Sequence, residues 1–167
     1  MPLSEHAVEE IRALPARFPE VRSAVMPALD IAQEEHGHLT PETMSEVAEL
    51  LRLDPGYVEG VATFYTLFHL AAVGEHHFSI CTNLSCTLRG AVELCDHVKH
   101  RIGVGEPKQV SEDGLFSYEE VECLGACEYA PVMRYDNRFH YDLTPTRLDQ
   151  LIARARGGES GRRAGGG

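Results

Sequence analysis

Apolar residues in the first 75 positions recur at intervals of three and four, the spacing that places side chains on one face of an α-helix. Four successive stripes show this spacing: Val8, Ile11, Leu14; Val21, Val25, Ala28, Leu29, Ala32; Met44, Val47, Ala48, Leu51; and Val58, Val61, Ala62, Tyr65. Thr40-Pro41 and Asp54-Pro55 are N-cap residues followed by a proline that fits the first helical position. We therefore predict four short helices before residue 75.

Two local features qualify this pattern. Pro27 lies inside the second stripe, where its missing N–H and its ring disfavour a helix interior. We expect a kink there or a helix that starts late. The aromatic residues Phe64, Tyr65 and Phe68 are expected to belong to the helix core.

From His76 onward the pattern changes to short alternating runs, which are typical of strands. The expected elements are a strand ending at Cys81, a helix from about Leu88 to Arg101, a strand over 115–123, a hairpin turning at Asp136-Asn137, and a helix beginning at Thr144-Pro145. This order indicates a small α/β domain with a mixed sheet. The chain as a whole is therefore predicted to be α+β, with a helical bundle over 1–74, an α/β domain over 75–156 and a disordered glycine-rich tail over 157–167.

Charge and hydropathy narrow the classes of function. The formal net charge of −11 argues against nucleic acids and anionic membranes as partners. The most apolar run, over 60–73, is too short to span a bilayer, and no secretory signal is evident. We expect a cytoplasmic location, where thiols stay reduced and clustered cysteines more often bind metal than form disulfides.

The candidate chemistry lies in two cysteine pairs, Cys81 with Cys86 and Cys123 with Cys127, each expected in a loop where a strand ends. A helix following Cys86 would direct free N–H groups toward the sulfurs, and Gly125 allows a positive φ. Four thiolates in this arrangement suit a [2Fe-2S] cluster.

Other uses of four cysteines remain open at this point. The spacing lies near the range of four-cysteine zinc sites, so a zinc-stabilised interaction module is the rival from another class. A thioredoxin-like oxidoreductase calls for Cys-x-x-Cys, which is absent, and a Rieske centre needs histidines that neither loop contains. A disulfide scaffold does not suit a chain of this size and compartment.

The fifth cysteine and the nine histidines do not extend the site. Cys95 shares a helical face with Ala91, Leu94, Val98 and Ile102 and is interpreted as a buried apolar residue. The histidine pairs, including His36 and His38, have no third ligand nearby in sequence and are interpreted as surface or loop residues.

Four stretches give the sequence a family resemblance: Gln33-Glu34-Glu35-His36-Gly37-His38-Leu39, Val58-Glu59-Gly60-Val61-Ala62-Thr63-Phe64-Tyr65, the loop from Cys81 to Cys86, and Val121-Glu122-Cys123-Leu124-Gly125-Ala126-Cys127 with Ala130-Pro131. They resemble the 24 kDa-type subunit of bacterial NADH:quinone oxidoreductase, respiratory complex I. The resemblance covers residues 10–155.

The resemblance implies a thioredoxin-like [2Fe-2S] ferredoxin domain behind a helical bundle, with Cys81, Cys86, Cys123 and Cys127 as cluster ligands. It further implies docking on the FMN- and NADH-binding subunit, transfer of one electron from FMN, and contacts with further complex I subunits in a peripheral arm on the cytoplasmic side. Such a subunit is not catalytic alone and does not insert into the membrane. NAD-linked hydrogenases and formate dehydrogenases contain similar subunits, and the sequence leaves these assemblies open.

From the stripes of the helical half we also expect a docking role. Four short helices alone make a small core, so part of the apolar surface at Met44, Val47, Leu51, Val58, Val61 and Tyr65 is expected to complete a partner interface.

Overall fold

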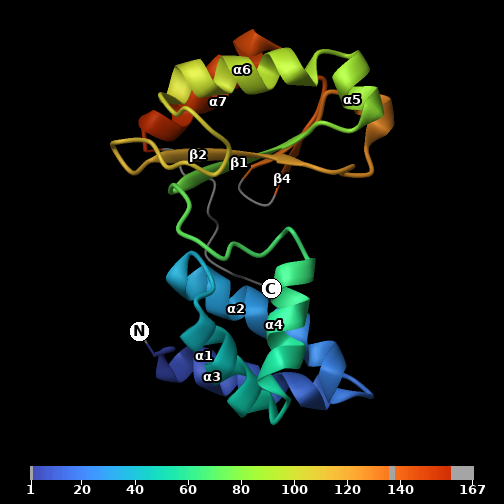
Figure 1. Cartoon of the computed structure of the whole chain (residues 1–167), viewed down its shortest axis with the longest axis vertical. Coiled ribbons are helices and arrows are strands. Elements are labelled where there is room, and N and C mark those ends of the chain that lie inside the picture. The colour runs from blue at the N-terminus through green and yellow to red at the C-terminus, as the bar shows by residue number, and fades with distance from the viewer. Residues whose placement is uncertain (1, 136–137, 159–167) are drawn as a thin grey trace. The chain divides into compact units, whose positions relative to one another are not determined.

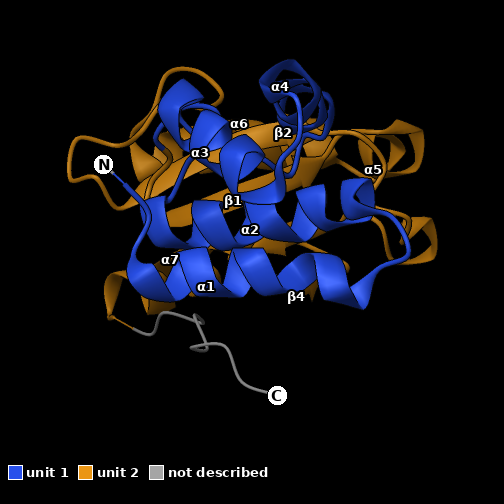
Figure 2. Ribbon diagram, turned by 90° about the horizontal axis from the view of Figure 1, so that it is seen from below, with its two compact units in different colours: residues 1–72 blue, residues 73–167 orange. Residues whose placement is uncertain are grey.

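The computed structural model describes residues 2–135 and 138–158. It contains two compact units, Met1–Ala72 and Val73–Gly167, which Figure 2 colours separately. The boundary expected from the sequence lies at residue 74, close to this division. The expected turn at 136–137 and all but the first two residues of the expected tail over 157–167 lie outside the described residues.

Unit 1 is helical, as predicted. Its elements are α1 (Glu5–Ala13), the 3₁₀ helices η1 (Leu14–Arg17) and η2 (Val21–Ala24), α2 (Val25–His36), α3 (Pro41–Leu51) and α4 (Pro55–Phe64). Side chains of Ser4, Thr40 and Asp54 accept N–H groups at the starts of α1, α3 and α4. These N-caps satisfy donors that a helix leaves unpaired at its first turn.

Pro27 is accommodated because α2 starts late. The helix begins at Val25, after the separate η2, so Pro27 lies in the first turn. N–H groups in a first turn have no partner within the helix, and the proline therefore removes no hydrogen bond. The helix continues without interruption to His36 and ends at Gly37, whose φ is 76°.

The apolar stripes of unit 1 pack mainly on one another. Met44, Val47, Leu51 and Val58 are all buried in a single core with residues of α1 and α2. The expectation that these stripes leave surface for a partner is therefore wrong for these four residues, because the helices bury them within their own unit.

The end of α4 and the segment after it differ from this core. Phe64 is 77% exposed and Tyr65 is 40% exposed, so of the three aromatic residues expected in the core only Phe68 is buried. The amide of Gln33 donates to the carbonyl of Leu67 and accepts the N–H of His69, which fixes the backbone of this segment.

Unit 2 contains a four-stranded mixed sheet in the order β2-β1-β3-β4. Its elements are β1 (His76–Cys81), α5 (Leu84–Leu88), α6 (Ala91–Ile102), β2 (Phe116–Val121), η3 (Cys127–Tyr129), β3 (Met133–Tyr135), β4 (Arg138–His140) and α7 (Pro145–Arg156). Strands β1 and β2 are parallel, whereas β3 is antiparallel to both β1 and β4. The predicted mixed sheet and the pairing of its C-terminal hairpin are confirmed.

The helix expected from Leu88 to Arg101 is two helices. Gly90, with a φ of 93°, separates α5 from α6. Few side chains tolerate this backbone conformation, so the chain changes direction there. As a consequence Cys86 lies within the short helix α5 and does not precede a long one.

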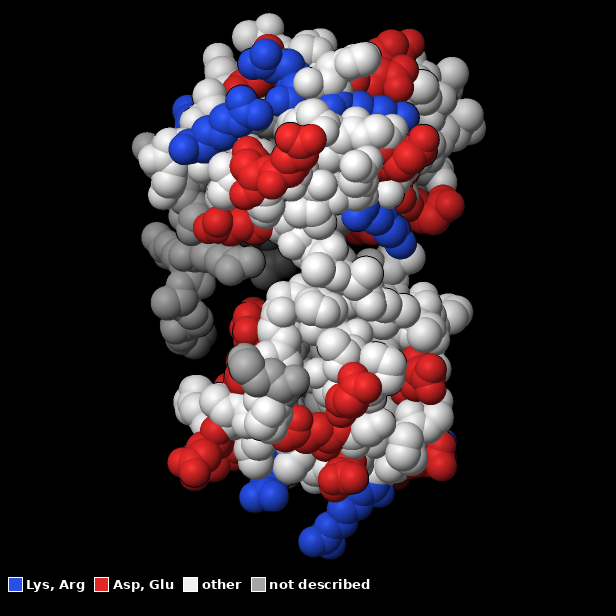
Figure 3. All heavy atoms as spheres, turned by 60° about the vertical axis from the view of Figure 1, so that its left-hand side comes forward, with Lys and Arg blue, Asp and Glu red and all other residues white. Residues whose placement is uncertain are grey.

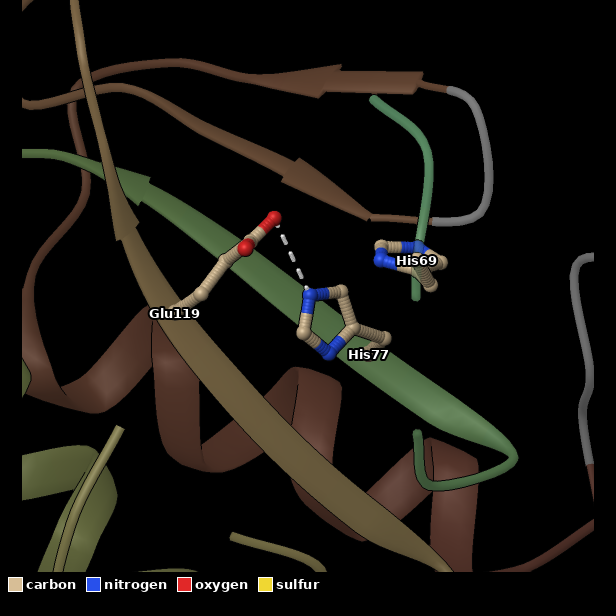
Figure 4. A group of neighbouring side chains, drawn as sticks. All are labelled: His69, His77 and Glu119. Atoms are coloured by element: carbon tan, nitrogen blue, oxygen red, sulfur yellow. Dashed lines mark ion pairs between the residues drawn. The ribbon is translucent and has the colours of Figure 1, made fainter. Parts of the chain in front are cut away.

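One face of the sheet is apolar and the other is polar. Helices α6 and α7 cover one face, where Phe78, Ile80, Phe116 and Tyr118 form the core (Figure 1). Successive side chains of a strand point to opposite faces, and the other face carries His77, Ser79, Ser117 and Glu119. There His77 Nε2 lies 3.2 Å from Glu119 Oε1 (Figure 4), and Ser79 Oγ donates to the same oxygen at 3.1 Å.

Candidate metal centre

The first cysteine pair is buried where β1 ends. Cys81 is the last residue of the strand, and its N–H donates to the carbonyl of Val132. Cys86 lies one short loop later in α5, and both side chains are 2% exposed. They pack with Ala91, Ala130 and Val132 in a small apolar cluster. This pair is therefore shielded from water.

The second pair lies at the surface. Cys123 follows the end of β2 by two residues and Cys127 is the first residue of η3, and both are exposed. Gly125 has the predicted positive φ, 78°, and its N–H donates to Cys123 Sγ at 3.4 Å. The two sulfur atoms of this pair are 3.3 Å apart.

The fold brings both pairs near each other. Burial, the Cys81 thiol and the charge of Cys127 together raise the pKa of Cys86, so the two pairs are close enough to act on each other electrostatically. One further contact joins the loops: the Asn83 amide donates to the Glu122 carboxylate at 3.1 Å. The sequence pattern does not predict this contact between Asn83 and Glu122.

Two of the thiols, those of Cys86 and Cys127, have raised pKa values. Burial raises the pKa of Cys86 to about 11, with the neighbouring thiol of Cys81 acting in the same direction. The hydrogen bond with Cys123 raises the pKa of Cys127, whereas the N–H of Gly125 lowers that of Cys123. Deprotonating two adjacent thiols is unfavourable because the two thiolates repel each other. A metal ion offsets this repulsion because it binds the thiolate form.

The geometry of the thiols fits a metal centre. A tetrahedral metal with bonds of roughly 2.3 Å holds its sulfur ligands roughly 3.8 Å apart. The 3.3 Å between Cys123 Sγ and Cys127 Sγ requires only a small outward movement of two exposed side chains. This distance therefore fits one metal ion held by the exposed pair, and the buried pair offers two further thiols from the other loop.

The remaining cysteine is separate from this centre. Cys95 lies on the buried face of α6 among Leu94, Val98 and residues of the sheet, and burial raises its pKa to about 12. A thiol in such surroundings behaves as a small apolar side chain, which is what its helical spacing predicted.

Several histidines have structural partners within unit 2. His76 Nδ1 is hydrogen-bonded to the hydroxyl of Tyr135 at 2.9 Å, and His97 Nε2 lies 2.9 Å from Asp149 Oδ1. The interpretation as a surface or loop residue is thus wrong for His76, which is buried in β1, whereas His97 is partly exposed on α6. Their partners lie 59 and 52 residues away along the chain, so no local pattern could indicate them.

Comparison with known proteins identifies the family. Residues 11–156 match the model of the thioredoxin-like [2Fe-2S] ferredoxins. The chain belongs to this family. The family resemblance and the [2Fe-2S] cofactor expected from the sequence are thereby confirmed, and the family cofactor disfavours the zinc alternative.

Individual members of the family resemble the chain over most of its length. It is 46% identical over 151 residues to a subunit of the NADH-quinone oxidoreductase of Rhizobium meliloti, covering 90% of this chain and 89% of the relative. It is 41% identical over 139 residues to NADH-quinone oxidoreductase subunit 2 of Thermus thermophilus, covering 83% and 76%.

The fold also matches a solved structure. A crystal structure of an NAD+-reducing [NiFe]-hydrogenase in the air-oxidized state superimposes with a TM-score of 0.67 at 20% identity. The match covers 79% of this ferredoxin-family chain and 23% of the hydrogenase chain. At this identity the match supports the fold.

Proposed function

We propose that this chain is an electron-transfer subunit of NADH:quinone oxidoreductase and that Cys81, Cys86, Cys123 and Cys127 hold its [2Fe-2S] cluster. The observation that supports the proposal is the close approach of two cysteine pairs whose first members, Cys81 and Cys123, are 42 residues apart in the sequence. The two relatives at 46% and 41% identity bear the name of this enzyme, which favours it over a hydrogenase or formate dehydrogenase.

When bound, the cluster supplies one-electron chemistry. The protein residues determine how far the cluster would be exposed to water. Cys81 and Cys86 would hold one side of it in the protein interior, whereas Cys123 and Cys127 would leave the other side at the surface. The N–H of Gly125 stabilises negative charge on Cys123 Sγ. Four anionic ligands in a chain of net charge −11 oppose a further electron, so we expect a low reduction potential.

The proposed electron donor is FMN on the NADH-oxidising subunit of the same complex. The chain would form part of the peripheral arm, on the cytoplasmic side of the membrane, and contact further complex I subunits. No helix in the described part of the chain is both long and apolar enough to cross a membrane.

The surface of the chain is acidic. Unit 1 contributes 12 of the 26 acidic residues and only 4 of the 15 basic ones. Figure 3 shows acidic side chains over the visible face of both units.

The test is a set of five single substitutions. Replacing Cys81, Cys86, Cys123 or Cys127 by Ala is expected to remove nearly all cluster, because one iron loses a ligand. Cys95→Ala, the matched control, is expected to retain it. Iron, acid-labile sulfide and visible absorbance would be measured on each purified variant. Zinc without sulfide in the wild-type protein would contradict the proposal, as would bleaching by Cys95→Ala alone.

The assembly needs a separate measurement. Purification of the tagged chain from its own cells is expected to recover the FMN-binding subunit and other complex I subunits. Recovery of hydrogenase or formate dehydrogenase subunits in their place would assign the same electron-transfer role to another enzyme.

A further inference from the structure

A row of polar side chains crosses the face of the sheet that points away from α6 and α7. It consists of Ser117 and Glu119 on β2 and of His77 and Ser79 on β1, which pair in register across the two parallel strands. His77 Nδ1 lies 2.7 Å from Ser117 Oγ, and His77 Nε2 lies 3.2 Å from Glu119 Oε1 (Figure 4). The Ser79 hydroxyl donates to the same carboxylate oxygen at 3.1 Å. The row therefore ends at a carboxylate held between the two strands.

The row leads along both strands toward the proposed metal centre. Ser79 and Cys81 are two residues apart in β1, so their side chains start from the same face of the sheet, about 7 Å apart along the strand. Glu119 is the register partner of Ser79 and contacts its hydroxyl. This arrangement places the carboxylate of Glu119 roughly 7–10 Å from the sulfur of Cys81.

Glu119 differs from the neighbouring acidic residues because it is buried. Its side chain is 5% exposed, whereas Glu120, Glu122 and Glu128 are exposed. The effective dielectric constant is about 80 for charges in water and about 20 for charges within a protein. At equal distance, the buried carboxylate therefore acts on the metal centre about four times as strongly as an exposed one.

The contacts of Glu119 suit an ionised carboxylate. Ser79 donates to Oε1, and Lys108 Nζ lies 3.9 Å from Oε2. An ionised carboxylate is purely an acceptor, and it persists in a protein interior when donors and an opposite charge lie beside it. The side chain of Lys108 is 74% exposed, so water screens its positive charge and the charge of Glu119 is only partly offset.

His77 is assigned as a neutral imidazole. Ser117 Oγ accepts the N–H of Gly74 at 2.8 Å and keeps its own proton for His77 Nδ1. The proton of the imidazole then belongs on Nε2, which faces Glu119. A neutral His77 leaves the negative charge of Glu119 in place.

We infer that Glu119 is a buried negative charge that lowers the reduction potential of the cluster. The inference rests on the proposed [2Fe-2S] centre. One electron leaves the donor, reduced FMN in the proposed enzyme, and enters the cluster, and the carboxylate repels this added charge. A unit charge about 10 Å away, at an effective dielectric constant of about 20, changes a one-electron equilibrium by about tenfold. Glu119 thus acts on electron transfer without contacting the cluster.

The test measures the reduction potential of the full chain with its cluster. Glu119→Gln removes the charge and keeps the shape, and Glu119→Leu puts an apolar side chain there, which buried ionic sites often tolerate. In both variants the ratio of reduced to oxidised cluster at a fixed potential is expected to rise about tenfold, which corresponds to a potential about 59 mV more positive. The titration is followed by visible absorbance at pH 8.5, where an ordinary histidine is neutral.

Two controls separate charge from structure. Glu119→Asp keeps the negative charge and is expected to keep the potential near the wild-type value. Glu120→Gln removes a charge from the next residue of β2, which is exposed and starts from the opposite face, and is expected to leave the potential unchanged. Iron, sulfide and the denaturation midpoint are measured for every variant, because a purely structural role would change stability and not the potential.

The possible failures are distinguishable. A wild-type chain without iron and sulfide would overturn the proposed function and the inference with it. A wild-type chain that contains the cluster, with the same potential in Glu119→Gln and Glu119→Leu, would overturn the inference alone. So would an equal rise of the potential in Glu119→Asp or Glu120→Gln, because the potential would not follow the buried charge. Loss of the cluster from both uncharged variants would also overturn it, because Glu119 would then serve the fold.

Discussion

Gly125 shows how the backbone conformation of one residue changes the properties of an exposed thiol. Its φ of 78° turns its N–H toward Cys123 Sγ, and this hydrogen bond lowers the pKa of that thiol. A side chain at this φ costs about 1–2 kcal/mol, more for a β-branched residue. The positive φ is the reason to expect sensitivity here, since no described atom lies within 4 Å of a Cβ placed at this position.

We predict that Gly125→Val lowers cluster content severalfold while the neighbouring Ala126→Ser leaves it nearly unchanged. The valine either strains the loop or rotates the N–H away from sulfur. Iron per chain, together with the thermal unfolding midpoint, would be measured for both variants. Equal iron content at equal stability would show that the backbone conformation at Gly125 has no part in holding the cluster.

Gly74 is required for a different reason, which is space. A Cβ at this position would lie 2.4 Å from the backbone carbon of Phe116, and the N–H of Gly74 donates to Ser117 Oγ at 2.8 Å. Gly60, in the middle of α4, has no atom within 4 Å of such a Cβ. The two glycines therefore form a matched pair with opposite expectations.

We predict that Gly74→Ala destabilises the protein by about 1–3 kcal/mol, as overpacking against backbone does. Gly60→Ala is expected to stabilise it by about 0.5–1 kcal/mol, because alanine is the better helix former. Chemical denaturation of both variants, followed by circular dichroism, measures the difference. The same change in stability for both would mean that β2 yields to the added methyl group.

At the scale of elements, a cluster of charged groups joins α6 to α7. Asp149 Oδ1 lies 2.9 Å from His97 Nε2 and accepts a hydrogen bond from Arg101 Nε at 2.7 Å. His97, which has the larger effect, and Arg101 together hold the pKa of Asp149 below its ordinary value. Because Asp149 is partly exposed, solvent screening limits the stabilisation to about 0.5–1 kcal/mol.

We predict that Asp149→Asn lowers the free energy of unfolding by this amount at neutral pH. A carboxyl whose pKa is lowered by folding stabilises the fold above its unfolded-state pKa and loses that contribution as the pH falls through its folded-state pKa. The difference between wild type and variant is therefore expected to shrink below about pH 4. Denaturation curves at several pH values test this, and a difference that persists in acid would point to packing instead of charge.

Among the described residues of the whole molecule, two large hydrophobic cores are separate from each other, in addition to the small cluster around Cys81 and Cys86. One includes only residues of unit 1, and the other packs α6 and α7 against the sheet of unit 2. The four cysteines of the proposed metal centre all belong to unit 2. The docking role proposed for unit 1 now depends on its exposed aromatic residues, Phe64 and Tyr65, because the stripes of α3 are buried.

We predict that a fragment beginning at Val73 still assembles the cluster but binds the flavin subunit at least about tenfold more weakly than the full chain. The fragment keeps Gly74 because of its hydrogen bond with Ser117. Cluster content and the Kd for the flavin subunit would be measured. The full chain with both Phe64→Ala and Tyr65→Ala is measured alongside, because it removes the exposed aromatic side chains and keeps the rest of unit 1. Undiminished binding would contradict the docking role of unit 1, and a colourless, unfolded fragment would show that the units fold cooperatively.

The sequence by itself determined the features that depend on neighbours along the chain. Helical spacing and the caps at Thr40 and Asp54 specified helices of unit 1, since each turn is built from local contacts. Alternation located β1, and cysteine spacing indicated the two loops of the proposed metal centre. The resemblance of the quoted stretches led to the family and its cofactor.

Tertiary structure alone decided the features that depend on partners distant in sequence. The order of the strands sets Cys81 and Cys86 in an apolar cluster and leaves Cys123 and Cys127 exposed, although the two pairs look alike in sequence. The need for glycine at position 74 depends on a strand 42 residues away. Burial and close approach are properties of the packed chain, so residues of the same type differ in role only after folding brings distant segments together.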